Sequence, residues 1–174
     1  PDLSDAKNLE VLNLARCESL VEIPSSIRNL QKLEELNMDF CRKLKVLPTH
    51  SNLASLVSLT MMGCWHLKKI PDISTNITTL SITDTMLEGL LESVRLWFGL
   101  QFLDIYGSVN VYHAIAEIYL KGRGEDIKKI PDCIKDLDGL KELHIYGCPK
   151  IASLPELPSS LKRLMVDTCE SLET

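Results

Sequence analysis

The chain has 174 residues and a formal net charge of −5, with 45% hydrophobic and 25% charged residues. This length fits one domain with a sizeable core. The lack of a Lys/Arg-rich run argues against nucleic-acid binding, and no apolar stretch reaches the roughly 18 residues of a membrane helix. Aromatic residues are only 5% of the chain, so we expect a core built mainly from leucines.

A spaced pattern of leucine-like residues repeats along the chain. Its full form is L-x-x-L-x-L-x-x-C-x-x-L-x-x-L/I-P, and complete copies begin at Leu9, Leu33 and Leu56. A period in the low twenties with this spacing is typical of a leucine-rich-repeat solenoid. Solenoids of this kind work by presenting a surface, so the pattern favours a binding function.

Each unit is predicted to contribute one short strand, its L-x-L segment, and these strands are predicted to pair in parallel about 4.8 Å apart. Side chains alternate along a strand, so Leu12 and Leu14 should point into the core while Asn13 faces out on the concave side. The proline-containing tail suits an irregular or 3-10 return on the convex side. The predicted fold class is an α/β solenoid, a leucine-rich-repeat horseshoe of about eight repeats.

Four later copies keep the leading positions of the pattern, and they begin at Ile77, Leu100, Leu140 and Leu161. In the first of these, Thr85 takes the cysteine place and Leu91 the proline place. In the second, Ser108 takes the cysteine place. The copy at Leu140 is complete again, and the last one runs to the end of the chain.

The interval from Leu100 to Leu140 is close to two periods and allows three interpretations. Ile115, Ile118 and Leu120 fit the pattern, which predicts a hidden eighth repeat that starts at Ile115. The interval could instead be one repeat with a long insertion. Residues 111–120 also carry apolar side chains at helical spacing, which is compatible with an amphipathic helix.

Both ends of the chain lack a polar capping unit. Pro1–Ser4 is similar to Pro71–Ser74, the tail of an internal repeat. A solenoid without caps exposes the side of its core. We therefore expect residues 1–174 to be one leucine-rich-repeat domain within a larger protein.

Five of the six cysteines occupy the same place in the repeat: Cys17, Cys41, Cys64, Cys148 and Cys169. Free cysteine is often buried, so these residues are expected to be structural thiols that point into the core. Cys133 is off this register and is expected on the convex side. No C-x-x-C pair supports a metal site, and many unpaired thiols favour a reducing compartment, the cytoplasm or the nucleus.

The outward strand positions gather aromatic residues in the second half of the chain. Aromatic side chains are enriched at binding hot spots because they bury a large area at low entropic cost. The surface could contact a flanking domain of the same protein or a separate protein. The candidate protein-binding residues are Phe102, Tyr106, Tyr119, His144 and Tyr146, together with Asp104 and Met62.

Catalytic and cofactor-binding motifs are missing from the sequence. It contains no G-x-S-x-G, no phosphate-binding glycine loop and no H-E-x-x-H. We therefore expect this region to be neither an enzyme nor a cofactor-binding domain.

Several strings resemble the repeat region of plant TIR–nucleotide-binding–LRR disease-resistance receptors. They include P-D-L-S-x-A-x-N-L-E from Pro1, C-x-S-L-V-E-I-P-S-S-I from Cys17, P-D-I-S-x-N-I from Pro71 and L-P-x-L-P-S-S-L from Leu154. The resemblance covers essentially the whole chain. Leu91, which stands where the family has proline, is a departure from it.

The resemblance implies a sensor that recognises a pathogen effector or a guarded host protein. It also implies that this region restrains the receptor while no ligand is bound. It also implies contacts with a nucleotide-binding domain that exchanges ADP for ATP, and a TIR domain that cleaves NAD⁺. Neither domain is in this chain. The main alternative is the substrate-recruiting repeat region of an F-box ubiquitin-ligase adaptor, whose units tend to be longer with convex helices.

Overall fold

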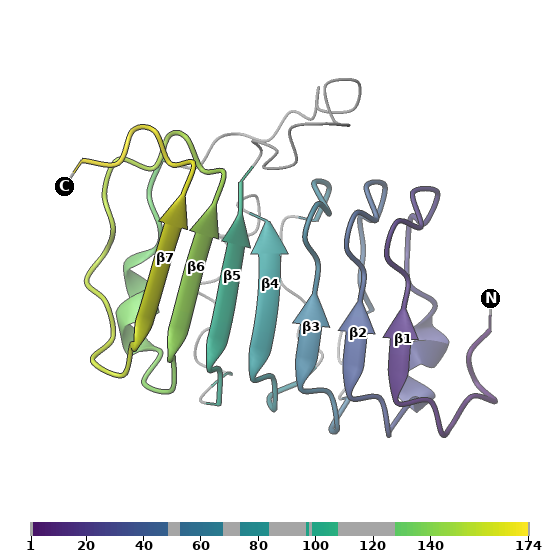
Figure 1. Ribbon diagram of the computed structural model, residues 1–174. Helices are drawn as coiled ribbons and strands as arrows, with labels where there is room; N and C mark the ends of the chain where they lie inside the picture. Colours follow the sequence, from purple (N-terminus) through teal and green to yellow (C-terminus); the bar gives the residue numbers. More distant parts are fainter. Residues whose placement is uncertain are drawn as a thin grey trace.

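The computed structural model describes residues 2–48, 53–67, 74–83, 97, 99–107 and 128–173. In this part of the chain, seven parallel strands form one sheet in sequence order, and Figure 1 shows them side by side with the returns behind them. The strands are β1 (Val11–Asn13), β2 (Glu35–Asn37), β3 (Ser58–Thr60), β4 (Thr79–Thr83), β5 (Phe102–Tyr106), β6 (Glu142–Tyr146) and β7 (Arg163–Asp167).

The register aligns the same repeat position in every strand. Leu12 lies opposite Leu36, which in turn lies opposite Leu59, and the alignment continues through Leu80, Leu103, Leu143 and Leu164. One turn of the chain therefore carries one copy of the sequence pattern. The predicted leucine-rich-repeat solenoid with a parallel strand in each unit is confirmed.

The core combines the inward-facing residues of the strands with apolar residues of the returns, stacked layer upon layer. In β2, Leu36 is 1% exposed, and the following Met38 is 0% exposed. Leu103 and Ile105 of β5 are likewise fully buried. Alternation along a strand places the residues between them on the outer sheet face, the face that the sequence pattern assigns to the concave side.

Two of the described returns contain a 3-10 helix that begins directly after a proline. These are η1 (Ser25–Asn29) after Pro24 and η4 (Asp132–Asp136) after Pro131. Proline holds φ in a range suited to a helix start and has no N–H to satisfy. Each helix buries one isoleucine, Ile27 or Ile134. The described returns contain no α-helix.

The predicted eighth strand does not lie between β5 and β6. These two strands pair directly over five positions, from Phe102 opposite Glu142 to Tyr106 opposite Tyr146. A strand from a repeat that starts at Ile115 would have separated them, so this part of the prediction is wrong. Ile115 and residues 108–127 as a whole lie outside the described part of the chain. The sheet fits the interpretation of one repeat with a long insertion.

The repeated cysteines are buried in the middle of the stack but not at its ends. Cys41, Cys64 and Cys148 are buried, whereas Cys17 is exposed and Cys169 is half-buried. The expectation that every one of them is buried is therefore wrong for the outer layers, because no neighbouring layer covers them there. Cys133, expected on the convex side, lies in η4 on the return side and is itself buried.

One core residue, Trp97, was not predicted. It is 1% exposed and its indole Nε1 donates a hydrogen bond to the carbonyl of Ser74 at 3.1 Å. Trp97 stands three residues before Leu100, the place that Leu53 fills before Leu56. Ser74 fills the same place one layer earlier, so a large residue packs beside a small one.

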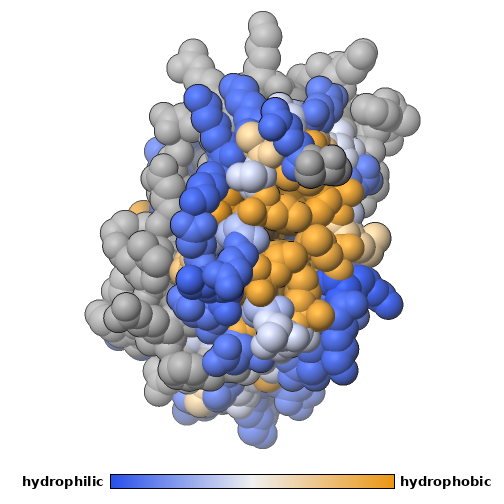
Figure 2. Space-filling model, turned by 90° about the vertical axis from the view of Figure 1, so that its left-hand side faces the viewer, coloured by the Kyte–Doolittle hydropathy of each residue, from blue (hydrophilic) through white to orange (hydrophobic). Residues whose placement is uncertain are grey.

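The β7 end of the stack is partly apolar. Leu164 is 38% exposed, and Leu161, Val166 and Leu172 are only partly buried. Figure 2 looks onto this end and shows a hydrophobic area at its centre. Among the described residues, no helix has the length and apolar character needed to cross a membrane.

Candidate protein-binding surface

Six residues of β5 and β6 form a continuous area on the outer sheet face. They are the outward residues of the two strands, and the register pairs Phe102 with Glu142, Asp104 with His144, and Tyr106 with Tyr146. We call this area the β5–β6 surface. Phe102 is 37% exposed, and the other five residues are half-buried.

The two tyrosines of this surface stack on each other. The ring centroids of Tyr106 and Tyr146 are 5.2 Å apart, and the ring planes differ by 20°. The His144 ring meets Tyr146 edge-on, with centroids 6.0 Å apart. Because neighbouring strands lie about 4.8 Å apart, equal positions in β5 and β6 bring the rings to stacking distance. Such pairs are favourable beyond their buried area, which fixes the rings before any partner arrives.

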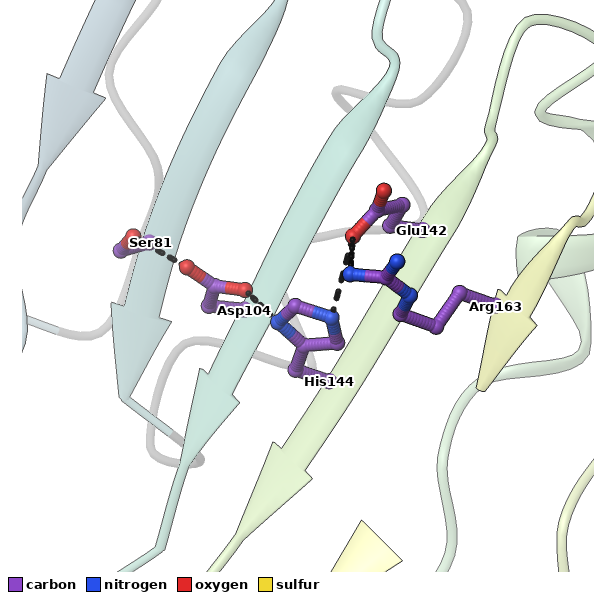
Figure 3. A network of polar contacts seen from close by, with 5 residues as sticks. All are labelled: Ser81, Asp104, Glu142, His144 and Arg163. Atoms are coloured by element: carbon purple, nitrogen blue, oxygen red, sulfur yellow. Dashed lines mark hydrogen bonds and ion pairs between the residues drawn. The ribbon is translucent and has the colours of Figure 1, made fainter. Parts of the chain in front are cut away.

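A polar network crosses the sheet next to the stacked rings, as Figure 3 shows. The Ser81 hydroxyl of β4 donates to Asp104 Oδ2 at 3.1 Å, and the Asp104 Oδ1 atom lies 2.9 Å from His144 Nδ1. Glu142 Oε2 lies 3.4 Å from His144 Nε2 and 3.3 Å from Arg163 Nη1 of β7.

The histidine ring lies between two carboxylates. Its Nε2 atom is buried and is within ion-pair distance of Glu142, but it makes no hydrogen bond of acceptable geometry. A neutral ring can donate to only one carboxylate, whereas a protonated ring can donate to both. The ring therefore links Asp104 of β5 to Glu142 of its own strand, β6.

Burial raises the pKa of the Tyr146 hydroxyl, and the negative charges of Asp104 and Asp167 add to this effect. The phenol therefore stays neutral and can donate a hydrogen bond at physiological pH.

The order of groups in the network does not suit nucleophilic catalysis. A serine nucleophile needs its hydroxyl on the histidine that deprotonates it. Here Ser81 contacts the carboxylate of Asp104, and the far nitrogen of His144 faces Glu142. Among the described residues, no group of three or more His, Cys, Asp or Glu side chains could hold a metal ion.

Comparison with known proteins agrees with this architecture. The family model described as Leucine Rich Repeat matches residues 8–30. Disease resistance protein RML1B of Arabidopsis thaliana is 49% identical in an alignment that covers 100% of this chain and 17% of the relative. Disease resistance proteins RML1A and RPP4 of the same plant are 44% and 35% identical over 99% and 100% of the chain.

This chain is a leucine-rich-repeat segment of the plant disease-resistance receptor family. The segment spans less than a fifth of the length of these relatives. The alignments cover 17% of RML1B, 18% of RML1A and 16% of RPP4.

Most of the predicted surface residues of this leucine-rich-repeat segment lie together. Phe102, Tyr106, His144 and Tyr146 share the β5–β6 surface with Asp104. Two predicted residues are not part of it: Met62 is half-buried in the turn after β3, and Tyr119 lies outside the described residues. Whether any of these residues contacts a partner stays a prediction.

Three members of the polar network were not among the predicted residues: Ser81, Glu142 and Arg163. All three stand at outward strand positions that the repeat register identifies. The signal that could have identified them is the residue directly opposite each one on the neighbouring strand. Ser81 lies in line with Asp104, and Glu142 in line with Arg163.

Proposed function

We propose that this leucine-rich-repeat segment is the protein-binding sensor and regulatory module of an intracellular plant immune receptor. In this role it recognises a pathogen effector or a guarded host protein and restrains the receptor while no ligand is bound. The single observation that supports the binding role best is the β5–β6 surface. It joins an exposed phenylalanine, a tyrosine stack and a polar network on adjacent strands.

Several features support a role in reversible protein recognition. Aromatic anchors surrounded by polar groups are typical of binding hot spots. The rings and the network contact one another across the sheet, so little ordering is needed when a partner binds. The similarity to Arabidopsis disease resistance proteins extends over the whole chain, which supports the immune setting.

The remaining parts of the proposal concern the longer protein. Exchange of ADP for ATP and cleavage of NAD⁺ would belong to other domains, and the segment would contact the nucleotide-binding domain. The four buried thiols, Cys41, Cys64, Cys133 and Cys148, support a reducing compartment, the cytoplasm or the nucleus.

The experiment that tests this function compares two pairs of substitutions in the longer receptor. Phe102→Ala with Tyr146→Ala removes two aromatic side chains from the β5–β6 surface. Val21→Ala with Val46→Ala is the matched control, because these valines are 48% and 59% exposed and stand in the returns. The measurement is pathogen-triggered cell death in leaf tissue at equal protein levels.

We expect the aromatic pair to abolish the response, since loss of two hot-spot side chains typically weakens binding by roughly 100-fold. The valine pair should respond as the unmodified receptor does. A normal response from the aromatic pair would show that the β5–β6 surface is not the sensing surface.

A further inference from the structure

The outer sheet face carries an excess of negative charge. Its outward positions, counted over the described residues, hold one basic side chain, Arg163, and five acidic ones, which are Glu35, Asp39, Asp104, Glu142 and Asp167. The whole chain has a formal net charge of only −5. Much of the imbalance is therefore concentrated on the face that the proposed function uses.

The charge is unevenly compensated along the strands. At one end of β6, Glu142 pairs with Arg163 at 3.3 Å. At the other end, Asp167 accepts a hydrogen bond from the Thr168 hydroxyl at 3.2 Å and pairs with no basic side chain among the described residues. Among the described residues, the Asp104 carboxylate contacts Ser81 and the ring of His144 and no lysine or arginine. Carboxylates without a lysine or arginine partner therefore lie beside the stacked tyrosines.

The tyrosine stack lies between these two carboxylates. Tyr146 is directly opposite Asp167 in the register, and Asp104 is opposite His144, two residues before Tyr146. The negative charges of both carboxylates act on the Tyr146 hydroxyl. An electron-rich aromatic face beside carboxylates attracts cations, and a planar guanidinium can stack on the ring and bind a carboxylate at once.

This chemistry selects among the possible partners. A nucleic acid or an acidic peptide would be repelled by the outer sheet face, and a purely apolar peptide would leave the carboxylates desolvated and unpaired. Charge complementarity raises the rate at which a diffusing partner associates. This gain in rate applies to molecules that meet by diffusion, so the charge favours a separate protein over a tethered domain.

We propose that the outer face of β5–β7 receives a basic segment of a separate protein, with an arginine or lysine side chain seated against the Tyr106–Tyr146 stack between Asp104 and Asp167. This inference rests on the proposed function, because it specifies the partner chemistry for the same surface. The cation would complete the contacts that the carboxylates lack, and the rings would cover its apolar stem.

Selection from a library of random linear peptides displayed on phage tests the proposal. The immobilised bait is the unmodified 174-residue chain, and Asp104→Asn with Asp167→Asn is the variant, which removes charge at nearly constant shape. The matched control is Glu22→Gln with Asp138→Asn, which removes the same charge from exposed residues outside the strands. Circular dichroism melting of all three proteins checks that they fold alike.

We expect selected peptides to be enriched in arginine and lysine, and to bind the carboxylate variant at least roughly tenfold more weakly than the unmodified chain. The control variant should bind them normally, and the interaction should weaken at high salt. Surface-dependent peptides without basic residues would overturn this inference and leave the proposed function standing. Failure to recover any peptide that depends on the β5–β6 surface, checked with Phe102→Ala and Tyr146→Ala, would count against both.

Discussion

At the scale of single residues, two of the cysteines that recur in the repeat donate hydrogen bonds to the backbone of the preceding layer. The Cys41 thiol donates to the carbonyl of Leu14 at 3.1 Å, and the Cys64 thiol donates to the carbonyl of Met38 at 3.0 Å. Each bond connects a turn to the preceding layer and adds a second donor to a carbonyl that already accepts a backbone N–H, from Cys17 or Cys41. A small, weakly polar side chain can do this without the desolvation cost of a stronger donor.

Thiol reactivity should follow this burial. Burial raises the pKa of the Cys64 thiol to about 12, so almost no thiolate forms near neutral pH, whereas Cys17 is exposed. Because the thiolate is the reactive form, we expect iodoacetamide to modify Cys17 at least roughly a hundredfold faster than Cys64. Peptide mass spectrometry over time measures both rates in one sample. Rates within tenfold of each other would contradict the described packing.

Asp39 should make stability depend on pH. Burial raises its pKa from 3.8, partly offset by a hydrogen bond from the Met62 backbone N–H at 2.8 Å. Below pH 3.8 the group is protonated in both the folded and unfolded chains and contributes nothing. Above pH 3.8 the unfolded chain ionises first, while this half-buried carboxyl stays protonated in the folded chain, so stability falls until pH has risen through the folded pKa.

The variant Asp39→Asn keeps an acceptor for Met62 without the charge. We therefore expect it to be more stable than the unmodified chain at about pH 7, and the difference to vanish at about pH 3. Urea unfolding at both pH values measures the difference. A variant that is less stable at neutral pH would show that the ionised carboxylate stabilises the fold.

At the scale of elements, the turns after β1, β2, β3, β6 and β7 share one backbone conformation. The residue before the cysteine place has a positive φ in five repeats, at Arg16, Phe40, Gly63, Gly147 and Thr168. Glycine adopts this conformation without strain. At Gly63 it also makes room, because a Cβ there would lie 2.6 Å from the Phe40 ring of the preceding layer.

The turn that follows β5 should tolerate no side chain at Gly107. A Cβ there would lie 2.0 Å from the carbonyl oxygen of Gly147 and 2.8 Å from the Cys148 sulfur, while the Gly107 N–H donates to the Tyr146 carbonyl at 2.7 Å. We expect Gly107→Ala to lower the free energy of unfolding by about 1–3 kcal/mol. Gly99→Ala is the control, since nothing lies within 4 Å of its Cβ position. Equal unfolding midpoints for the two variants in urea would disprove the close approach of these turns.

The sequence predicts the repeated strands well because each one depends on a short local pattern. Leu103 and Ile105 of β5, for example, are identified by spacing alone. The pattern does not predict which strands become neighbours across the interval from Leu100 to Leu140. Ile115, Ile118 and Leu120 match the spacing by themselves, but spacing in one segment carries no information on pairing between β5 and β6.

At the scale of the whole molecule, the candidate site depends on the stacking of layers. The outward positions of Phe102, Tyr106, His144 and Tyr146 follow from alternation within a strand, so they could be predicted. Their contacts depend on which residue of the neighbouring layer lies opposite, so the Ser81–Asp104–His144 network could not. Direct pairing of β5 with β6 places Tyr106 against Tyr146, so the layer order that the sequence leaves open creates the surface.

Site-specific photo-crosslinking tests the central claim, that a separate protein binds the β5–β6 surface, most directly. Benzoylphenylalanine replaces Phe102 in one form of the complete receptor and Val46, which is 59% exposed in a return, in the control. Both are irradiated in pathogen-treated leaf tissue, and the adducts are identified by mass spectrometry. We predict an adduct with a separate protein from position 102 and none from position 46. Adducts formed equally from both positions, or only with other parts of the receptor itself, would contradict the account.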